Sequence, residues 1–298
     1  MSERARMAAQ HADLRQDGEA LAAPLPALLA DAEHLASNML LGEHGRRRPG
    51  IGEEFWQYRP AMASDGARLI DWRRSARSDT HYIREKEWQA AQSVVIWVDG
   101  SQSMDFASQG RQTKGDRARL LAMAIAILLL RGGERVGLTG NMVPPRRGEV
   151  QLLRIAQGLF STDGEREDFG APDVTGILPK SRALFVSDFM GPLVEVEAAL
   201  TEAADLGVRG ALLQVLDPAE EAFPFDGRTV FESMGGGMRH ETLEAAALRD
   251  RYLKRLADRK DRLADLARIT GWQVTCHHTG DSAQAALLWL FGALERRR

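Results

Sequence analysis

From residue 94 onward, short apolar runs alternate with longer segments whose apolar residues recur at helical spacing. The apolar runs cover residues 94–98, 134–139, 182–189, 208–216 and 271–277. Between the first two lies a segment, residues 120–130, that is apolar all round and therefore predicts a helix buried between layers. Alternation of this kind is typical of strands and helices in a parallel, doubly wound sheet. We predict an α/β fold of the Rossmann type, with a mostly parallel sheet, over residues 91–298.

The first 90 residues follow another pattern. Apolar residues at helical spacing over 25–39 predict an amphipathic helix within a helical segment, residues 1–41, and packing on the main body is favoured over docking to a partner. Four glycines and a proline over 42–52 indicate a linker. Residues 53–88, rich in arginine and aromatic residues, predict three short antiparallel strands. Linker and strands together form a small β lobe, residues 42–90.

Composition narrows the class of protein. The chain has 298 residues, a formal net charge of −3 and one cysteine, Cys276, so neither a disulfide within the chain nor a cysteine-rich zinc site is expected. The small net charge disfavours nucleic acid as a partner. The longest apolar run, residues 120–130, is too short to span a bilayer. We therefore expect a cytoplasmic protein without stable membrane insertion and without a nucleic-acid partner.

Polar residues follow the first strand at alternate positions. Asp99, Ser101 and Ser103 come directly after the apolar run 94–98, and Asp188 follows the run that begins at residue 182. The carboxyl ends of parallel strands are where ligands bind in such sheets. Carboxylate and hydroxyl oxygens suit Mg²⁺, which takes only a few protein ligands. The alternative is a simple Asx or Ser turn in which Ser103 caps the next helix.

These residues resemble those of known proteins. Asp99-x-Ser101-x-Ser103, with Asp188 in a later strand, resembles the metal-ion-dependent adhesion site of von Willebrand factor A domains. The chain is more closely similar to the bacterial domain of unknown function 58 family, which carries a von Willebrand A-like domain. The motifs that carry this likeness are Glu54-Phe55, Tyr58-Arg59-Pro60, Ile70-Asp71-Trp72, Ser75-Ala76-Arg77, Arg84-Glu85 and Ser187-Asp188-Phe189. The resemblance implies a further metal ligand, which we place at Thr162.

The resemblance also implies a function. Members of this family are thought to act with MoxR-type AAA+ ATPases as chaperone-like assembly factors. We therefore expect a non-enzymatic, Mg²⁺-dependent adaptor whose partner is such an ATPase or its client. A cation held by few protein ligands keeps an open position, which a partner's acidic side chain can complete. The alternative is a Mg²⁺-dependent hydrolase or phosphoryl-transfer enzyme that uses Asp99 and Asp188.

Overall fold

The computed structural model describes residues 25–37, 49–62, 66, 70–76, 80–87, 92–140, 143–160 and 166–295. The chain divides into two compact units, one drawn from Met1–Met39 together with Gln92–Arg298, the other from Leu40–Ala91.

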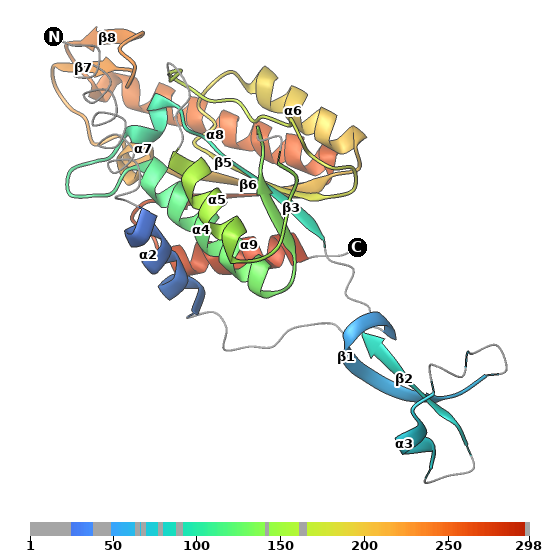
Figure 1. Ribbon diagram of the computed structural model, residues 1–298. Coiled ribbons are helices and arrows are strands. Elements are labelled where there is room, and N and C mark those ends of the chain that lie inside the picture. The colour runs from blue at the N-terminus through green and yellow to red at the C-terminus, as the bar shows by residue number, and fades with distance from the viewer. Residues whose placement is uncertain are drawn as a thin grey trace, which may run out of the picture. The chain divides into compact units, whose positions relative to one another are not determined.

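The first unit is built on a five-stranded parallel sheet (Figure 1). In spatial order the strands are β4 (Arg135–Leu138), β3 (Ser93–Val98), β5 (Arg182–Ser187), β6 (Arg209–Leu216) and β9 (Gln273–His278). The chain moves from β3 to one neighbour, β4, and then to the other neighbour, β5. In doubly wound folds the crevice for ligands forms where the strand order reverses in this way. The predicted α/β fold with a mostly parallel sheet is confirmed, and its switch point lies between β3 and β5.

Helices cover both faces of this sheet. Successive side chains of β3 point to opposite faces, because side chains alternate along a strand. Val94 and Ile96 pack against α4 (Lys114–Arg131), α5 (Glu149–Phe160) and α9 (Ala283–Glu295). Val95 packs against α6 (Leu193–Asp205) and α8 (Ala246–Thr270) on the other face. Both faces of the strand are therefore buried, which explains its unbroken apolar run.

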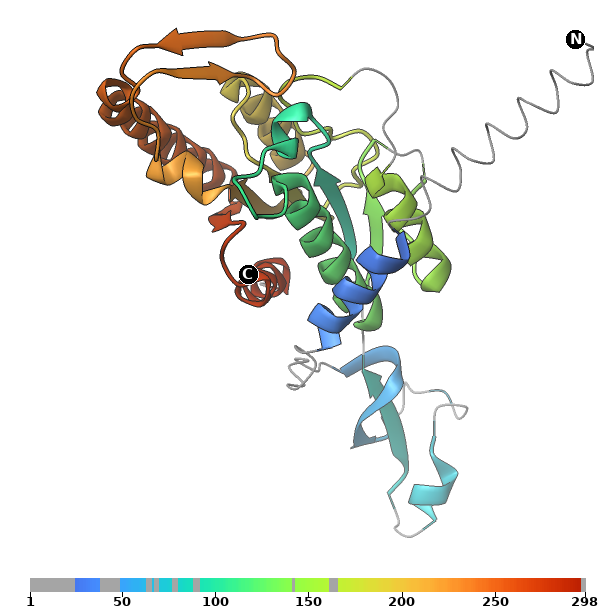
Figure 2. The same ribbon diagram turned by 90° about the vertical axis from the view of Figure 1, so that its left-hand side faces the viewer.

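Helix α4 lies at the centre of the larger core. It contacts the sheet on one side and α2 (Leu25–Ser37), α5 and α9 on the others, and Figure 2 shows α2 lying beside α4 and α5. Ala32 and Ala36 of α2 are fully buried there. Because neighbouring elements surround α4, its apolar residues point in every direction, as the sequence predicts. The packing of α2 agrees with the expectation that the N-terminal helix lies on the main body.

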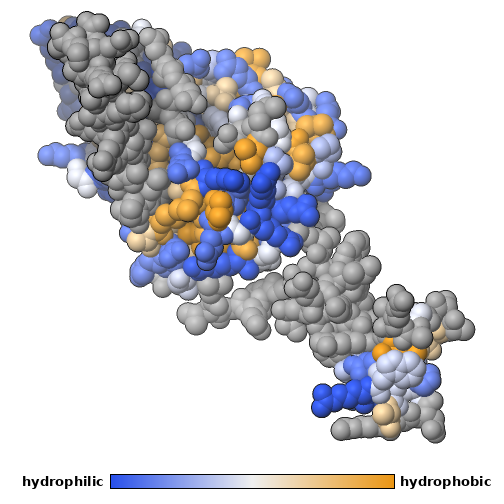
Figure 3. Space-filling view, viewed as in Figure 1, coloured by the Kyte–Doolittle hydropathy of each residue, from blue (hydrophilic) through white to orange (hydrophobic). Residues whose placement is uncertain are grey.

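The outer surface of α5 is partly apolar. Val150 and Leu153 are 64% and 53% exposed, and Figure 3 shows apolar side chains interspersed with hydrophilic ones on this side of the first unit. Between β4 and α5, Arg146 forms an isolated antiparallel bridge with Val136. Single exposed apolar side chains are common on soluble domains, so we assign this surface no role.

The second unit contains an antiparallel strand pair, as expected, but its described residues form no third strand, only an isolated bridge between Ile70 and Ile83. β1 (Pro49–Pro60) pairs with β2 (Tyr82–Glu87), and the predicted middle strand is the short helix α3 (Trp72–Ser75). Asp71 caps this helix by accepting a hydrogen bond from the Arg74 amide, and Ser75 Oγ donates to the Asp71 carbonyl. Such local bonds compete with a strand ladder. Strand β1 begins at Pro49, inside the predicted linker.

A second antiparallel pair, the β7–β8 hairpin, projects from the first unit. It consists of β7 (Thr229–Glu232) and β8 (Arg239–Thr242), which follow the short helix α7 (Pro218–Ala222). Phe231 of the hairpin stacks on Phe223, which also contacts Phe225 and Tyr252. Burial in this aromatic cluster raises the pKa of Tyr252 to about 12. The cluster anchors the hairpin to α7 and α8.

His277 of β9 is a buried neutral histidine. Its side chain is 4% exposed, and its Nε2 has no partner among the described residues. Burial, assisted by the charge of Arg117, lowers its pKa from 6.5 to about 4. The unfolded chain therefore takes up the proton at a higher pH than the folded chain. Stability from this group is complete above about pH 6.5 and declines as the pH falls toward about 4.

We expect His277→Gln to flatten the acid limb of the stability profile. Wild-type unfolding free energy should fall by up to about 3 kcal/mol over that pH range because of this one residue. Urea titrations at a series of pH values measure the effect. His240→Gln, at an exposed position of β8, is the control and should keep the wild-type slope. Equal slopes in wild type and His277→Gln would contradict the assignment.

Candidate functional site

The loop after β3 places three predicted residues together. Asp99 Oδ1 accepts a hydrogen bond of 2.8 Å from the Ser101 amide, which closes an Asx turn. The Ser101 and Ser103 hydroxyls lie 3.2 Å apart. Ser101 is the N-cap of the short 3₁₀ helix η2 (Gln102–Asp105), but its side chain makes no capping bond. The Asx turn that the sequence offered as the alternative to a metal site is therefore present. The helix cap by Ser103, also part of that alternative, is absent from this loop.

Asp188 comes to the same place from the neighbouring strand. Val98 of β3 pairs with Val186 of β5, so the two strands end side by side. Ser187 Oγ donates a hydrogen bond of 2.6 Å to Asp99 Oδ2 and accepts one from the Phe189 amide. The structure therefore brings Asp99, Ser101, Ser103 and Asp188 together at the switch point. Thr162 lies outside the described residues.

Lys114 is a site residue that the sequence analysis missed. Its Nζ lies 2.8 Å from Asp188 Oδ2 and 2.7 Å from Glu220 Oε1, and the side chain is almost fully buried. It sits in the first turn of α4, directly after the N-cap Thr113. A cation is disfavoured at a helix N-terminus by the helix dipole. A lysine in this position is therefore a signal that an acidic partner lies nearby.

Glu220 connects this lysine to α7. Its Oε2 accepts a hydrogen bond of 2.8 Å from the Asp217 amide, which completes a capping box at the start of the helix. Asp217 in turn accepts bonds from the Ser108 amide and hydroxyl. The acid at the end of β6 is thus a helix cap, and the Lys114–Asp188–Glu220 triad joins α4, β5 and α7.

Burial has the largest effect on the pKa values of Asp99, Lys114 and Glu220. Burial raises the pKa of Asp99, and the nearby charge of Asp188 raises it further. Burial favours the neutral amine of Lys114, but the carboxylates of Asp188 and Glu220 outweigh this effect and raise its pKa. Burial raises the pKa of Glu220, and Lys114 opposes that shift. The triad is thus an ion-pair network, whereas Asp99 is a buried acid beside another acid.

A second segment, residues 166–170, lies against the Asp99 loop. The amides of Gln102 and Ser103 donate to the carbonyls of Glu167 and Asp168 at 2.8 and 2.9 Å. Gly170 approaches so closely that a Cβ there would lie 2.6 Å from Asp99 Cγ. Only a residue without a side chain fits at this distance. The segment therefore covers the carboxylate of Asp99 in this conformation.

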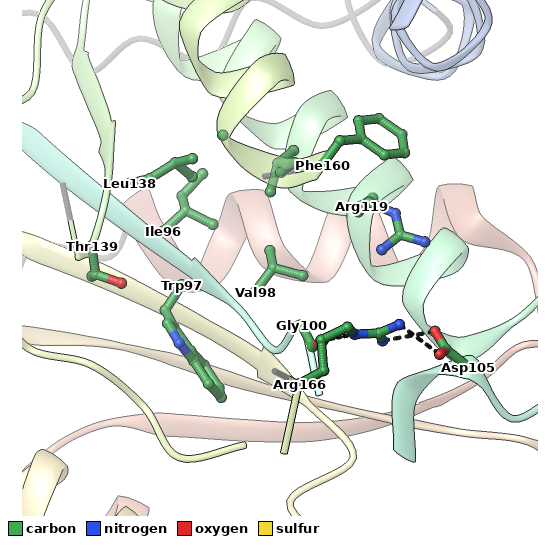
Figure 4. A pocket seen from close by; sticks show the side chains of 12 residues that line it. Ile96, Trp97, Val98, Gly100, Asp105, Arg119, Leu138, Thr139, Phe160 and Arg166 are labelled. Carbon is green, nitrogen blue, oxygen red and sulfur yellow. Dashed lines mark hydrogen bonds and ion pairs between the residues drawn. The ribbon is translucent and has the colours of Figure 1, made fainter. Parts of the chain in front are cut away.

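Arg166 fastens the same segment to the loop. Its guanidinium donates two hydrogen bonds to the Asp105 carboxylate, at 2.7 and 2.9 Å, and others to the carbonyls of Gly100 and Ser101. Figure 4 shows this planar fork facing Asp105. A bidentate arginine–carboxylate pair combines strength with a defined geometry. Arg166 thus positions the backbone that carries Ser101.

The turn of the β7–β8 hairpin contacts the segment 166–170, which covers Asp99. Ser233 Oγ donates to Asp168 Oδ2 at 2.8 Å, and a Cβ at Gly235 would lie 2.7 Å from both Asp168 Cγ and Gln102 Oε1. Three segments far apart in the sequence therefore meet at the carboxyl edge of the sheet. We call this surface the strand-end face; it comprises residues 99–105, 166–170 and 233–237.

A pocket of about 260 Å³ opens beside the strand-end face (Figure 4). Gly100, Asp105 and Arg166 form part of its wall, together with Trp97, Thr139 and Arg119. None of the four described metal-site candidates lines it. The pocket is therefore a neighbour of the site and gives no direct access to the carboxylates of Asp99 and Asp188.

The donor set at Asp99 fits a small, hard cation. Two cis ligands of an octahedral Mg²⁺ lie about 3 Å apart, close to the separation of the two serine hydroxyls. Among the described residues, no basic side chain forms an ion pair with Asp99. Asp188 differs, because Lys114 already compensates its charge. The described part of the chain holds no cluster of three or more His, Cys, Asp or Glu suited to a metal, so hydroxyl ligands are needed.

Comparison with known proteins places this chain in a family. Residues 57–262 match the family described as "Protein of unknown function DUF58". The chain belongs to the DUF58 family. The matched range includes Asp99, Ser101, Ser103, Lys114 and Asp188, so the site lies within the part of the chain that the family covers. The fold is compatible with the von Willebrand A-like domain that the sequence resemblance implies.

Two mycobacterial proteins are similar to this DUF58 protein over most of its length. The chain is 30% identical over 265 residues to the uncharacterized protein Mb1516 of Mycobacterium bovis, covering 85% of this chain and 82% of the relative. The uncharacterized protein Rv1480 of Mycobacterium tuberculosis matches to the same extent. These relatives show the family and carry no description of an activity.

Solved structures are similar to this chain only at low identity and low TM-score. An aerotolerance-related membrane protein from Bacteroides fragilis is 15% identical, with a TM-score of 0.41, over 68% of this chain and 98% of that chain. The conserved hypothetical protein BatB from Bacteroides thetaiotaomicron is 14% identical, with a TM-score of 0.38 and the same coverage. An uncharacterized membrane spanning protein from Vibrio fischeri is 16% identical, with a TM-score of 0.21, over 69% of this chain and 98% of that chain.

These matches correct one expectation. The expected cytoplasmic location is wrong by this comparison, because matched structures are described as membrane proteins. The expectation rested on composition and on the length of apolar runs, and neither feature identifies the location of a protein. Within the residues that the structure describes, no helix is long and apolar enough to cross a membrane.

Proposed function

We propose that this DUF58 protein is a non-enzymatic protein-interaction module that binds its partner at the strand-end face. The observation that carries the proposal is the grouping of Asp99, Ser101 and Ser103 at the switch point, beside Asp188. Three segments from distant parts of the sequence build this face, and its backbone is held by Arg166. Polar groups from several segments can supply the hydrogen bonds that a protein interface uses.

We propose further that Mg²⁺ assists binding. Asp99, Ser101 and Ser103 are the residues that would hold it. Bound there, Mg²⁺ supplies positive charge that attracts an acidic side chain of the partner. The proposed partner is a MoxR-type AAA+ ATPase or its client, as the family resemblance suggests.

An enzymatic role for Asp99 and Asp188 is less well supported by the geometry. Both carboxylates are 1% exposed and accept hydrogen bonds. The adjoining pocket is lined by neither of them. A nucleophile or general base must lie within hydrogen-bond reach of its substrate. Since neither Asp99 nor Asp188 lines the adjoining pocket, we propose binding rather than hydrolysis.

Mg²⁺ should stabilise the folded protein if the proposed site takes it. At an excess of about tenfold over its Kd, Mg²⁺ should raise Tm by about 2–4 °C through mass action. Asp99→Ala should abolish the shift because it removes the carboxylate ligand, whereas Asp258→Ala, at an exposed position of α8, should retain it. Thermal unfolding with Mg²⁺ and with EDTA measures both. A shift of equal size in Asp99→Ala would remove Asp99 from the site.

The partner is tested by affinity capture. The full chain, immobilised and exposed to lysate of its native host, should enrich a MoxR-type AAA+ ATPase, with more recovered in Mg²⁺ than in EDTA. Asp99→Ala should lose the Mg²⁺-dependent part of the recovery, and Asp258→Ala should behave as wild type. Mass spectrometry identifies the captured proteins. Absence of any AAA+ ATPase from both samples would contradict the proposed partner.

A further inference from the structure

Lys114 is a buried cation beside the proposed metal site. Fully buried lysines are rare in folded proteins unless their charge is paired. Here the ammonium lies 2.8 Å from Asp188 Oδ2 and 2.7 Å from Glu220 Oε1, and 5.7 Å from the centre of the Phe106 ring. Burial of this charge at the N-terminus of α4 opposes the helix dipole. The fold therefore retains the ammonium here despite two unfavourable effects.

The Lys114 ammonium is bound to Asp188, the carboxylate that a metal at the switch point would otherwise use as a ligand. Asp188 Oδ2 is bound to Lys114 and its Oδ1 accepts from the Met190 amide, so both oxygens have partners. Of the two acids at the switch point, Asp188 forms an ion pair with Lys114, whereas Asp99 forms none among the described residues and interacts only at longer range with the charge of Arg166. A divalent cation held by Asp99, Ser101 and Ser103 would thus meet one carboxylate without an ion-pair partner, and the ammonium of Lys114 bound to the neighbouring acid Asp188.

We infer that Lys114 is a specificity-determining residue that weakens binding of divalent cations at Asp99. The reason is Coulombic repulsion across a dry interior, where charges interact more strongly than in water. Because the site alone then has a weak affinity for the cation, the cation stays bound only when a carboxylate of the partner adds negative charge. Metal binding and partner binding are then coupled, each tightening the other. This inference rests on the proposed function and names the residue that makes the metal depend on the partner.

The inference is tested by measuring Mg²⁺ affinity of the full chain by calorimetry. We compare wild type with Lys114→Gln, which removes the charge but keeps a hydrogen-bonding group. Lys254→Gln, at an exposed position of α8, is the matched control for the change in net charge. Lys114→Gln should bind Mg²⁺ at least about tenfold more tightly than wild type, whereas Lys254→Gln should not differ. Adding Asp99→Ala to Lys114→Gln should abolish binding.

If Lys114→Gln does not fold, a second pair of variants tests the effect of the ammonium on Mg²⁺ affinity. Glu220→Gln and the double variant Lys114→Gln with Glu220→Gln differ by the same ammonium, in a background with less buried negative charge. The double variant should bind Mg²⁺ more tightly than Glu220→Gln alone. Equal or weaker affinity in the folded variant that lacks Lys114, in either comparison, would overturn the inference.

The outcomes separate the inference from the proposed function. If wild type binds no Mg²⁺ but Lys114→Gln binds it through Asp99, the inference stands and the metal-dependent part of the function fails. If wild type binds Mg²⁺ and loss of Lys114 leaves the affinity unchanged, the function stands and the inference fails. If no variant binds Mg²⁺, the inference is overturned, and capture of the partner in EDTA still decides the interaction itself.

Discussion

Replacing Lys114 by methionine is expected to lower the free energy of unfolding by about 3–5 kcal/mol. The substitution keeps most of the side-chain volume but removes the only cation that contacts Asp188 among the described residues. Two carboxylates, one directly after β5 and one on α7, then remain close together without an ion-pair partner among the described residues. Breaking one half of a buried ion pair is costly because the remaining charge stays desolvated. Urea denaturation of the full chain, with Mg²⁺ absent, measures the loss.

Lys254→Met is the control for this measurement. Lys254 is exposed on α8, so the same chemical change there should alter stability by no more than about 0.5 kcal/mol. The loss in Lys114→Met should also shrink at low pH, where Glu220, whose pKa is raised by burial, takes up a proton. A loss within the range of the control would show that the triad contributes nothing to stability.

Gly170→Ala is expected to disrupt the site through its backbone. An alanine Cβ at this position would lie 2.6 Å from Asp99 Cγ, so either the carboxylate or the segment 166–170 must move. Overpacking of this kind typically costs about 1–3 kcal/mol. The displaced carboxylate of Asp99 can then no longer bind the same Mg²⁺ as Ser101 and Ser103. We expect the Mg²⁺-dependent rise in Tm to be lost in this variant.

Gly100→Ala separates this effect from the loss of a glycine. Gly100 lies in the Asp99 loop itself, yet a Cβ there would meet no heavy atom within 4 Å. The variant should therefore keep both the wild-type stability, within about 0.5 kcal/mol, and the Mg²⁺ response. Thermal and urea unfolding of the two variants, side by side, provide the comparison. A full Mg²⁺ response in Gly170→Ala would show that the segment 166–170 does not set the position of Asp99.

Much of the fold follows from local pattern. The unbroken apolar run 94–98 predicts a strand covered on both faces, and β3 has helices on either side. The all-apolar stretch 120–130 predicts a central helix, and α4 is surrounded on all sides. These signals are reliable because burial on two or more sides leaves no position for a polar residue.

Predictions from the sequence were wrong where short-range hydrogen bonds of side chains competed with the conformation that the residue pattern indicated. Residues 68–77 alternate well enough to predict a strand, but Asp71 and Ser75 close the helix α3 instead. Ser103 stands where a helix cap would be expected, yet the chain enters η2 with Ser101 in the N-cap position. In both cases one or two side-chain contacts, worth about 1 kcal/mol each, decide between conformations of similar energy.

The sequence by itself determined the sheet, the strand ends, and therefore the meeting of Asp99, Ser101, Ser103 and Asp188. Parallel strands end at one edge, so an acid after each of two neighbouring strands must arrive near the other. Only the tertiary structure decided what surrounds these oxygens. Lys114 lies 74 residues from Asp188, and Gly170 meets Asp99 from a segment without regular structure. Neither contact has a periodic signal in the sequence, because it depends on how the loops pack over the sheet.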